Sequence, residues 1–264
     1  MGEGNHSVQS DAAVKAPVID PPALAAQFEA AGRATGFRIE RFGEAAGTPL
    51  FAMTKRTSGP RPRIYISSGI HGDEPAPPLA LLDMLEAGVF GRHATWFICP
   101  LLNPAGFMRG VRENAGGLDL NRDYKDLRSA EIAAHIAWLR RQPNFDLSLC
   151  LHEDWESKGF YLYELNPTAR PSLAEPMIAA VTPLCAIDPA TEIDGRAVDM
   201  PGIIRPVSDP LMRENWPEAI YLRANHTTLS YTLETPSAFP LAQRIATMRA
   251  AVETALGLAT APVP

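Results

Sequence analysis

The residues of this sequence best suited to chemistry are two histidines and a glutamate, His71, Glu74 and His152. His71 and Glu74 are three apart in the stretch GIHGDEP, so in a tight turn or a first helical turn both can point at one ion. The carboxylate offsets one charge of a divalent metal, and imidazole suits zinc. His152 ends a later apolar run and is the best placed third ligand. Two histidines and one carboxylate leave a position for water, so we predict a catalytic site with one Zn²⁺ ion.

The other histidines fit a metal site less well. His6 lies near the start of the chain, His93 in a predicted loop, and His135 in a predicted helix as a surface or packing residue. His226, close before a predicted strand, is the alternative third ligand. Gly72, between the first two ligands, is expected to let the backbone turn sharply because it has no Cβ.

A second carboxylate, Glu234, is suited to moving a proton. It ends the apolar run 228–234, and its neighbours Leu233 and Pro236 are apolar. Burial there could raise its pKa to where a carboxylate both accepts and passes on a proton. A capping or salt-bridging glutamate is the alternative interpretation, in which case Glu153 or Asp154 is the next candidate base.

These side chains follow a repeated pattern of elements. After residue 62, short apolar runs alternate with helix-like segments, which is typical of a mostly parallel sheet in an α/β domain. In such sheets ligands bind outside the carboxyl ends of the strands. Each predicted strand ends on or just before a polar group, the four groups being His71, Asn103, His152 and Glu234.

The remaining chain divides into a short tail and one domain. Residues 1–19 are polar and predicted to be a flexible tail, and residues 20–260 are predicted to form a single domain. Two strands near its start fit 37–43 and 49–56. The stretch 186–227 is rich in Pro and Gly and is typical of a binding loop. Helices are predicted at 21–34, 75–86, 129–141 and 241–256.

Composition excludes several classes of function. The chain has 264 residues, 46% of them apolar, and a net charge of −6, which predicts no binding to nucleic acid or to an anionic membrane. It has no apolar stretch near the roughly 20 residues of a membrane span, and residues 1–19 lack the apolar core of a secretory signal. The three cysteines, Cys99, Cys150 and Cys185, are widely spaced, which favours buried reduced thiols over a disulfide framework. The expected location is the cytoplasm, and no oligomeric state is indicated.

Four motifs in order resemble a known family. They are GIHGDEP (69–75), NPAGFMRGVRENAGGLDLNRDY (103–124), LHED (151–154) and YTLETPS (231–237). Together they are similar to the zinc metallocarboxypeptidases of the carboxypeptidase A type, in the order and spacing of the compact bacterial branch, over about residues 60–256. This family is related to the succinylglutamate desuccinylase/aspartoacylase group. The resemblance implies a mixed, mostly parallel twisted sheet with helices on both faces.

The resemblance also implies roles for single residues. His71, Glu74 and His152 match the zinc ligands, a two-histidine, one-glutamate set that carboxypeptidase A is known for. Glu234 matches the general base. These roles agree with the chemistry that the residue types allow by themselves.

Arginines in the second motif match groups that bind the substrate. An arginine beside the metal can stabilise negative charge on the carbonyl oxygen, and Arg112, nine residues before Asn121, matches it, with Arg109 as the rival. Asn121 and Arg122 match the pair that grips a substrate carboxylate, which a guanidinium can hold bidentately. A turn with a structural ion pair is the alternative for this motif.

Two features depart from the family pattern. The late tyrosine near the scissile bond has no clear match, and Tyr221 and Tyr231 are both candidates. Arg196 and Arg205, in the unassigned stretch, are either solvated surface charges or partners for an acidic group of the substrate.

The leading hypothesis is a zinc-dependent hydrolase that removes a residue with a free carboxylate from the C-terminus of a small peptide. The alternative is an N-acyl amino acid deacylase similar to aspartoacylase or succinylglutamate desuccinylase. The nine-residue gap between Arg112 and Asn121, and the motif LETPS, favour the peptidase. A catalytically silent binding protein on the same fold is a third class, disfavoured because no ligand or candidate base is missing.

Overall fold

A computed structural model describes residues 19–168 and 170–261; all but the last residue of the predicted tail at 1–19 lie outside this range. The helices are α1 (Pro21–Ala34), α2 (Ala76–Glu86), α3 (Pro104–Arg109), η1 (Leu120–Arg122), α4 (Ala130–Leu139), α5 (Ala174–Val181), η2 (Pro210–Met212), α6 (Glu218–Asn225) and α7 (Leu241–Ala259). The strands are β1 (Arg38–Ala45), β2 (Thr48–Lys55), β3 (Arg63–Ser67), β4 (Thr95–Cys99), β5 (Leu147–Asp154), β6 (Tyr161–Leu165), β7 (Glu192–Ile193), β8 (Arg196–Ala197), β9 (Ile203–Ile204) and β10 (Ser230–Pro236).

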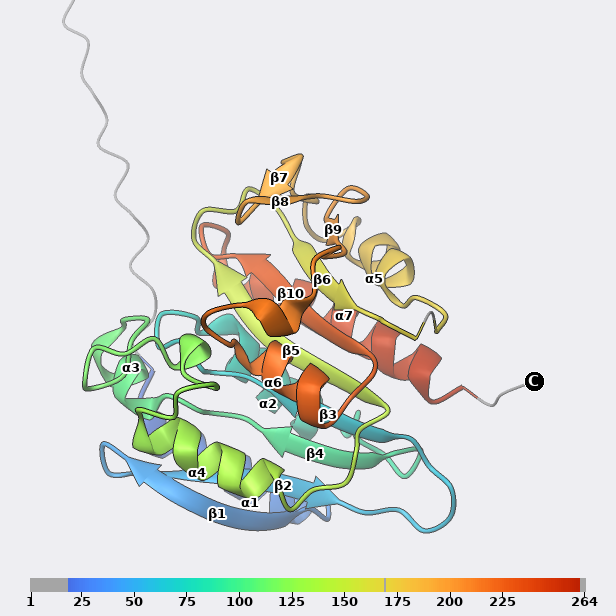
Figure 1. The fold of residues 1–264 in the computed structure, drawn as a ribbon. Helices are drawn as coiled ribbons and strands as arrows, with labels where there is room; N and C mark the ends of the chain where they lie inside the picture. Colours follow the sequence, from blue (N-terminus) through green and yellow to red (C-terminus); the bar gives the residue numbers. More distant parts are fainter. Residues whose placement is uncertain (1–18, 169, 262–264) are drawn as a thin grey trace, which may run out of the picture.

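One mixed sheet forms the centre of the molecule (Figure 1). Its eight strands lie in the order β1-β2-β4-β3-β5-β10-β6-β9, and the four middle strands β4, β3, β5 and β10 are parallel. The antiparallel strands lie towards the edges, β1 and β2 on one side and β6 on the other. The carboxyl ends of the parallel strands therefore meet in the middle of one sheet edge.

Helices cover both faces of the sheet. On one face, α1, α2, α5 and α7 bury one apolar core that includes Phe28, Leu81, Met177 and Met248. On the other, α4 and α6 bury a second core around Ile136 and Leu222, and these two helices lie on the near face in Figure 1. The predicted single α/β domain with helices on both faces is confirmed.

Capping side chains and first-turn prolines explain where the predicted helices begin. Asp20 caps α1 by accepting a hydrogen bond from the backbone N–H of Ala23, and Ser129 caps α4 through the N–H of Ile132. Pro21 and Pro77 lie in the first turns of their helices, where a missing N–H costs nothing. The predicted helices and the core strands agree with the structure to within a few residues.

Among the elements of five residues or more, α3, α5, α6 and β6 were not predicted. α6 and the short strands β7–β9 lie in the stretch 186–227, which the sequence analysis left unassigned. The three cysteines are free and buried, as expected. Over the described residues, every helix is too short or too polar to span a bilayer.

Candidate active site

The loop between β3 and α2 carries the first two predicted ligands. It turns at Gly69, whose φ of +66° belongs to the left-handed region that favours glycine. Gly72 is needed for a different reason from the one predicted: a Cβ there would lie 1.9 Å from the carbonyl carbon of Gly106. This close approach of two backbone segments presses the loop against α3 and places His71 and Glu74 side by side.

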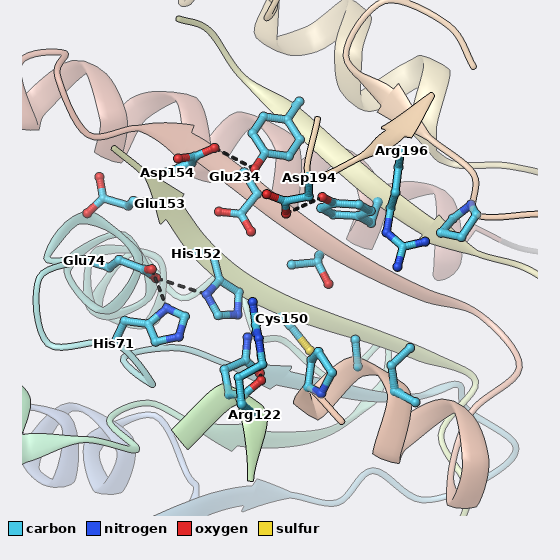
Figure 2. Close-up of a pocket in the computed structure, with 18 of the residues that line it drawn as sticks. His71, Glu74, Arg122, Cys150, His152, Glu153, Asp154, Asp194, Arg196 and Glu234 are labelled. Carbon is cyan, nitrogen blue, oxygen red and sulfur yellow. Dashed lines mark hydrogen bonds and ion pairs between the residues drawn. The ribbon is translucent and has the colours of Figure 1, made fainter. Parts of the chain in front are cut away.

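The three predicted ligands converge on one point. The Nδ1 atom of His71 lies 2.5 Å from one carboxylate oxygen of Glu74, and Nδ1 of His152, from β5, lies 3.1 Å from the other. Figure 2 shows both imidazoles directed at this carboxylate. One donor atom from each residue lies within 4.8 Å of the others, and all three side chains are buried. This donor set fits a divalent metal, with two nitrogens and a carboxylate to hold it.

The electrostatics of Glu74 keep this site ionised. Burial by itself would raise the pKa of Glu74, but the imidazoles of His71 and His152 lower it to about 2. The carboxylate is therefore ready to bind a cation at neutral pH.

Asp119 supports the site from behind, a role that the sequence analysis missed. Its carboxylate lies 3.2 Å from Nε2 of His71, accepts a hydrogen bond of 3.0 Å from Nε of Arg112 and one of 2.8 Å from the backbone N–H of Asn121. Burial opposes its ionisation, yet His71 and Arg112 hold its pKa well below the usual range. A carboxylate on the far nitrogen of a histidine ligand fixes the ring and its tautomer. The only sequence signal was its place in GLDLNRD.

Glu234 lies beside His152 because of strand register. β10 forms a parallel pair with β5, in which Glu234 lies opposite His152. It forms an antiparallel pair with β6, in which Glu234 lies opposite Tyr161. Burial, together with the charges of Glu74 and Asp154, raises its pKa well above the ordinary carboxyl value. The carboxylate therefore faces the same space as the metal donors (Figure 2).

The two candidate arginines have different surroundings. Arg112 lines the pocket, bonds Asp119 and lies 3.6 Å from a carboxylate oxygen of Glu74. Arg109 does not line the pocket, and its guanidinium donates to the backbone carbonyls of Glu113 and Asn114. Geometry thus favours Arg112 over Arg109 for contact with a substrate.

Asn121 and Arg122 reach the same pocket from η1. The side-chain oxygen of Asn121 accepts a hydrogen bond of 2.9 Å from the backbone N–H of Glu218, which turns its amide group in one direction. Arg122 donates to the carbonyl of Asn121, at 2.9 Å, and is half-buried. Both can donate to an anion in the pocket.

The other residues singled out in the sequence lie elsewhere. Asn103 caps α3 and bonds the carbonyl of Arg112, so it supports the arginine loop instead of lining the pocket. His135 is fully buried, with its two ring nitrogens bonded to Tyr65 and Tyr124. His93 and His226 lie against aromatic rings outside the pocket.

Neither candidate for the late tyrosine, Tyr221 or Tyr231, lines the pocket. Tyr221 packs against Tyr124, and Tyr231 is fully buried with its hydroxyl bonded to Glu164 and the N–H of Leu173. Instead, Tyr161 and Tyr163 of β6 line the pocket. The sequence analysis missed β6, because the charged and small residues before it obscure its alternation.

The acids after His152 are also separated by the fold. Glu153 is buried, where it accepts hydrogen bonds from Arg244 (2.5 Å) and from the backbone N–H of Ala76 (2.8 Å). It joins β5 to α7 and to the start of α2, directly after the ligand loop. Asp154 accepts a hydrogen bond from the hydroxyl of Tyr161.

These residues surround one cavity of about 260 Å³, called the active-site pocket below. Its lining includes His71, Glu74, Arg112, Asn121, Arg122, Cys150, His152, Asp154, Trp155, Tyr161, Tyr163, Leu165, Asp194, Arg196, Arg213, Ala219, Ile220, Thr232 and Glu234. Arg196 is in the lining, whereas Arg205 pairs with Glu164, Glu175 and Asp199 outside it.

Comparison with known proteins agrees with this geometry. The family model of the succinylglutamate desuccinylase/aspartoacylase catalytic domain matches residues 60–187, which include the three metal donors. A solved structure from Shewanella amazonensis, provisionally named a metallopeptidase, is 26% identical, with a TM-score of 0.77 over 89% of this chain and 91% of that one. The chain is thus similar in sequence to the succinylglutamate desuccinylase/aspartoacylase catalytic domain over residues 60–187 and similar in fold to carboxypeptidase-like metallopeptidases.

More distant proteins share the fold or part of the sequence. A metallo-carboxypeptidase from Burkholderia cenocepacia has the same fold, with a TM-score of 0.63 and 20% identity over 88% of this chain and 67% of that one. Carboxypeptidase SOL1 from Arabidopsis thaliana is 34% identical over 109 residues, 33% of this chain. The match spans 22% of the plant protein, about a fifth of its length.

Proposed function

We propose that the protein is a zinc-dependent hydrolase that removes a residue with a free carboxylate from the C-terminus of a small peptide. The observation that carries the proposal is that one pocket is lined by the three metal donors, by Glu234 and by the pair Asn121 and Arg122. A proton acceptor, a metal site and a carboxylate site in one cavity are the parts that such a reaction needs.

The chain's own groups have distinct tasks in the proposed reaction. Zinc held by His71, Glu74 and His152 would supply Lewis acidity, which makes water a usable nucleophile near neutral pH. Glu234 accepts the proton of the attacking water and passes it to the leaving nitrogen. Arg112 donates to the carbonyl oxygen as negative charge builds on it.

The remaining groups hold substrate and machinery in place. Arg122 donates to the terminal carboxylate of the substrate, and the Nδ2 group of Asn121 helps, since its oxygen is already used by Glu218. Asp119 joins the two halves of the site, because one carboxylate contacts both His71 and Arg112.

An N-acyl amino acid deacylase is the second candidate, favoured by the match of residues 60–187 to the desuccinylase/aspartoacylase domain. Both reactions hydrolyse an amide and release an amino acid with a free carboxylate. They differ only in what lies on the acyl side, which is a peptide in one and a simple acid in the other.

A hydrolysis screen with metal analysis of the same sample tests the proposal. The substrates are peptides with a free C-terminus, the same peptides amidated, and N-acyl amino acids. We expect one equivalent of zinc and cleavage of the free peptides only. Cleavage of N-acyl amino acids alone would select the deacylase, and preference for the amides would overturn both candidates.

Ligand variants connect the metal to the activity. His71→Ala, Glu74→Ala and His152→Ala should each lose close to one equivalent of zinc and all activity. His93→Ala, outside the pocket, is the control and should keep both. Full zinc retention in His152→Ala would remove it from the proposed ligand set.

We also propose a cytoplasmic location on the basis of the three buried free thiols, which subcellular fractionation can test.

A further inference from the structure

Glu218 is a buried carboxylate beside the active-site pocket, and it has no part in the proposed chemistry. It begins α6 and is 1% exposed. Its chain neighbours Pro217 and Ala219 line the pocket, whereas its own side chain contacts the core. Its two oxygens accept hydrogen bonds from hydroxyl groups on β3, from Tyr65 at 2.6 Å and from Ser67 at 2.8 Å. Burial raises the pKa of this carboxyl, and the two hydrogen bonds oppose that shift.

The hydroxyl of Tyr65 extends this contact into a series of hydrogen bonds. Its oxygen lies 3.0 Å from Nε2 of His135 on α4, and Nδ1 of His135 lies 2.8 Å from the hydroxyl of Tyr124. The four side chains of this series, which begins at Glu218, are each at most 2% exposed. They lie on the face of the sheet that α4 and α6 cover (Figure 1).

The direction of each hydrogen bond follows from the number of protons. Burial lowers the pKa of His135 to about 3, so its imidazole is neutral at pH 7 and has one N–H group. Tyr65 donates its single proton to Glu218, so its oxygen can only accept, and Nε2 of His135 must be the donor. Nδ1 then accepts from the hydroxyl of Tyr124. Each donor of the series therefore has an acceptor, and the carboxylate of Glu218 is the last of them.

The two ends of this series hold the same short loop. The backbone N–H of Glu218 donates to the side-chain oxygen of Asn121, at 2.9 Å, and Tyr124 follows three residues after Asn121. The hydrogen bonds therefore close on themselves through residues 121–124, and we call this arrangement the hydrogen-bond ring. Arg122 lies inside the stretch that closes it. The ring thus fixes the loop that carries the proposed site for a substrate carboxylate.

The hydrogen-bond ring determines which end of the Asn121 amide is left for a ligand. Because the oxygen of Asn121 is held by the N–H of Glu218, its Nδ2 group is the free end, and Asn121 lines the pocket. A carboxylate binds donors, so a reversed amide would present an oxygen to it and repel it. The guanidinium of Arg122 donates to the backbone carbonyl of Asn121, so a shift of this loop would displace both groups.

We propose that Glu218 is a positioning residue for the binding of a substrate carboxylate. Through the hydrogen-bond ring it holds Asn121 with the amide nitrogen, not the oxygen, towards the pocket. An apolar side chain would fill the same space, but it would leave the buried hydroxyl groups of Tyr65 and Ser67 without their acceptor. The proposal rests on the proposed function for the role of Asn121.

The preference for a free over an amidated C-terminus reports on this role. The ratio of kcat/KM is measured for the best-cleaved peptide of the hydrolysis screen and for its amide. Glu218→Ala should lower the ratio by about tenfold, mainly through KM of the free peptide, because a hydrogen bond to a charged group is worth at least that. The zinc content should stay at the wild-type value.

The conservative variant Glu218→Gln should keep most of the preference. Its carbonyl oxygen can accept from Tyr65, and its amide can donate to the oxygen of Ser67 once that hydroxyl has rotated. Tyr65→Phe removes one hydroxyl of the hydrogen-bond ring and should lower the ratio as well. It supplies the test by itself if Glu218→Ala does not fold, as judged by circular dichroism.

Glu164→Ala is the matched control. Glu164, on β6, is also a buried carboxylate that accepts a tyrosine hydroxyl, that of Tyr231 at 2.8 Å, but its other partners are Ser172 and Arg205. This variant should have a lower Tm and the wild-type ratio. Because the ratio compares two substrates of one preparation, a loss of folded protein alone does not change it.

Binding of free amino acids separates this proposal from the proposed function. Calorimetry compares L-alanine, L-leucine and L-glutamate with their α-amides. The wild type and Glu164→Ala should bind the acids selectively, and Glu218→Ala should not. If this pattern holds but no substrate is cleaved, the proposed activity fails and the positioning role stands. If peptides are cleaved with the wild-type ratio in both Glu218→Ala and Tyr65→Phe, the positioning role is overturned and the proposed function stands.

Discussion

At the scale of single residues, carboxylates organise this site. Glu74 faces two imidazoles with its two oxygens, and Asp119 contacts His71 and Arg112 with its own two. The ionised donors needed for a cation are therefore held by contacts within the chain. Glu234 differs, because burial raises its pKa and so disfavours its charged form, although its carboxylate faces the three metal donors.

Glu234→Gln should separate chemistry from binding. Glutamine keeps the shape but cannot take a proton from water at neutral pH, so kcat should fall by at least about 10²–10⁴-fold. KM and the zinc content should change little, since Glu234 is not a proposed ligand. Loss of zinc in this variant would make Glu234 a ligand, and full activity would move the base to another acid.

The activity of the wild type should fall at low pH, because burial raises the pKa of Glu234. The pKa of Glu234 is raised above its ordinary value of 4.5, and only the deprotonated form accepts a proton. Activity should therefore fall as the pH is lowered, from a pH above 4.5. A pH–rate profile that stays flat down to pH 4.5 would contradict this role.

Arg122→Ala tests the carboxylate anchor. One charge-assisted contact is worth about 1.5–3 kcal/mol, so KM for peptides with a free C-terminus should rise about ten- to a hundredfold. The same peptides amidated should lose far less, and comparison of the two KM values is the measurement. Equal losses would show that Arg122 serves the structure only. Arg128→Ala, on the exposed surface after η1, is the control.

Sequence motifs indicated the metal donors and Glu234, but they did not indicate residues that reach the pocket only through the pairing of strands or the course of a loop. His71, Glu74 and Glu234 have a motif or an apolar run that points to them. Tyr163 and Arg213 have neither, because they line the pocket only through the pairing of β6 with β10 and the course of the chain after η2. Such positions depend on contacts between distant segments.

At the scale of elements, β10 connects the two halves of the site. It lies between β5 and β6, and its register places Glu234 and Thr232 beside the matching residues of both neighbours. The sequence predicted β10 and β5 from continuous apolar runs, which buried parallel strands have. It could not give their order in the sheet, and it missed β6, a short strand near the edge.

Gly72→Ala should test the contact between the ligand loop and α3. A Cβ 1.9 Å from the carbonyl carbon of Gly106 cannot be accommodated without moving backbone. Overpacking costs about 1–3 kcal/mol, so we expect a lower Tm together with weaker zinc binding, because His71 and Glu74 flank this residue.

Gly257→Ala is the matched control for this substitution. Gly257 lies in α7, where a Cβ would meet nothing within 4 Å. Alanine favours a helix by up to about 1 kcal/mol over glycine, so its Tm should stay equal or rise. Normal zinc binding and Tm in Gly72→Ala would mean that the loop and α3 can move apart freely.

At the scale of the whole molecule, the metal donors connect separate parts of the chain. His71 and Glu74 precede α2, while His152 lies in β5, in the middle of the sheet. A ligand that binds only the folded protein stabilises it, by about 2.7 kcal/mol at a concentration one hundred times its Kd. A bound metal should therefore stabilise the folded protein by linking these parts of the chain.

Chelation should lower the Tm of the wild type, and added zinc should restore it. The measurement is thermal unfolding followed by circular dichroism before and after treatment with a chelator. His71→Ala should unfold at the same temperature in both states, since it has no zinc to lose. An unchanged wild-type Tm, with zinc loss verified by metal analysis, would sink the idea.

The place of β10 also decides when the site can exist during synthesis. β5 and β6 follow each other in the chain, yet the strand between them is Ser230–Pro236, made much later. A nascent chain that has emerged only as far as α6 contains every proposed zinc ligand and all the pocket arginines, but not Glu234. Glu234, the proposed proton acceptor, is thus synthesised after the other groups of the site, and the proposed hydrolysis cannot begin until the chain has been made past β10.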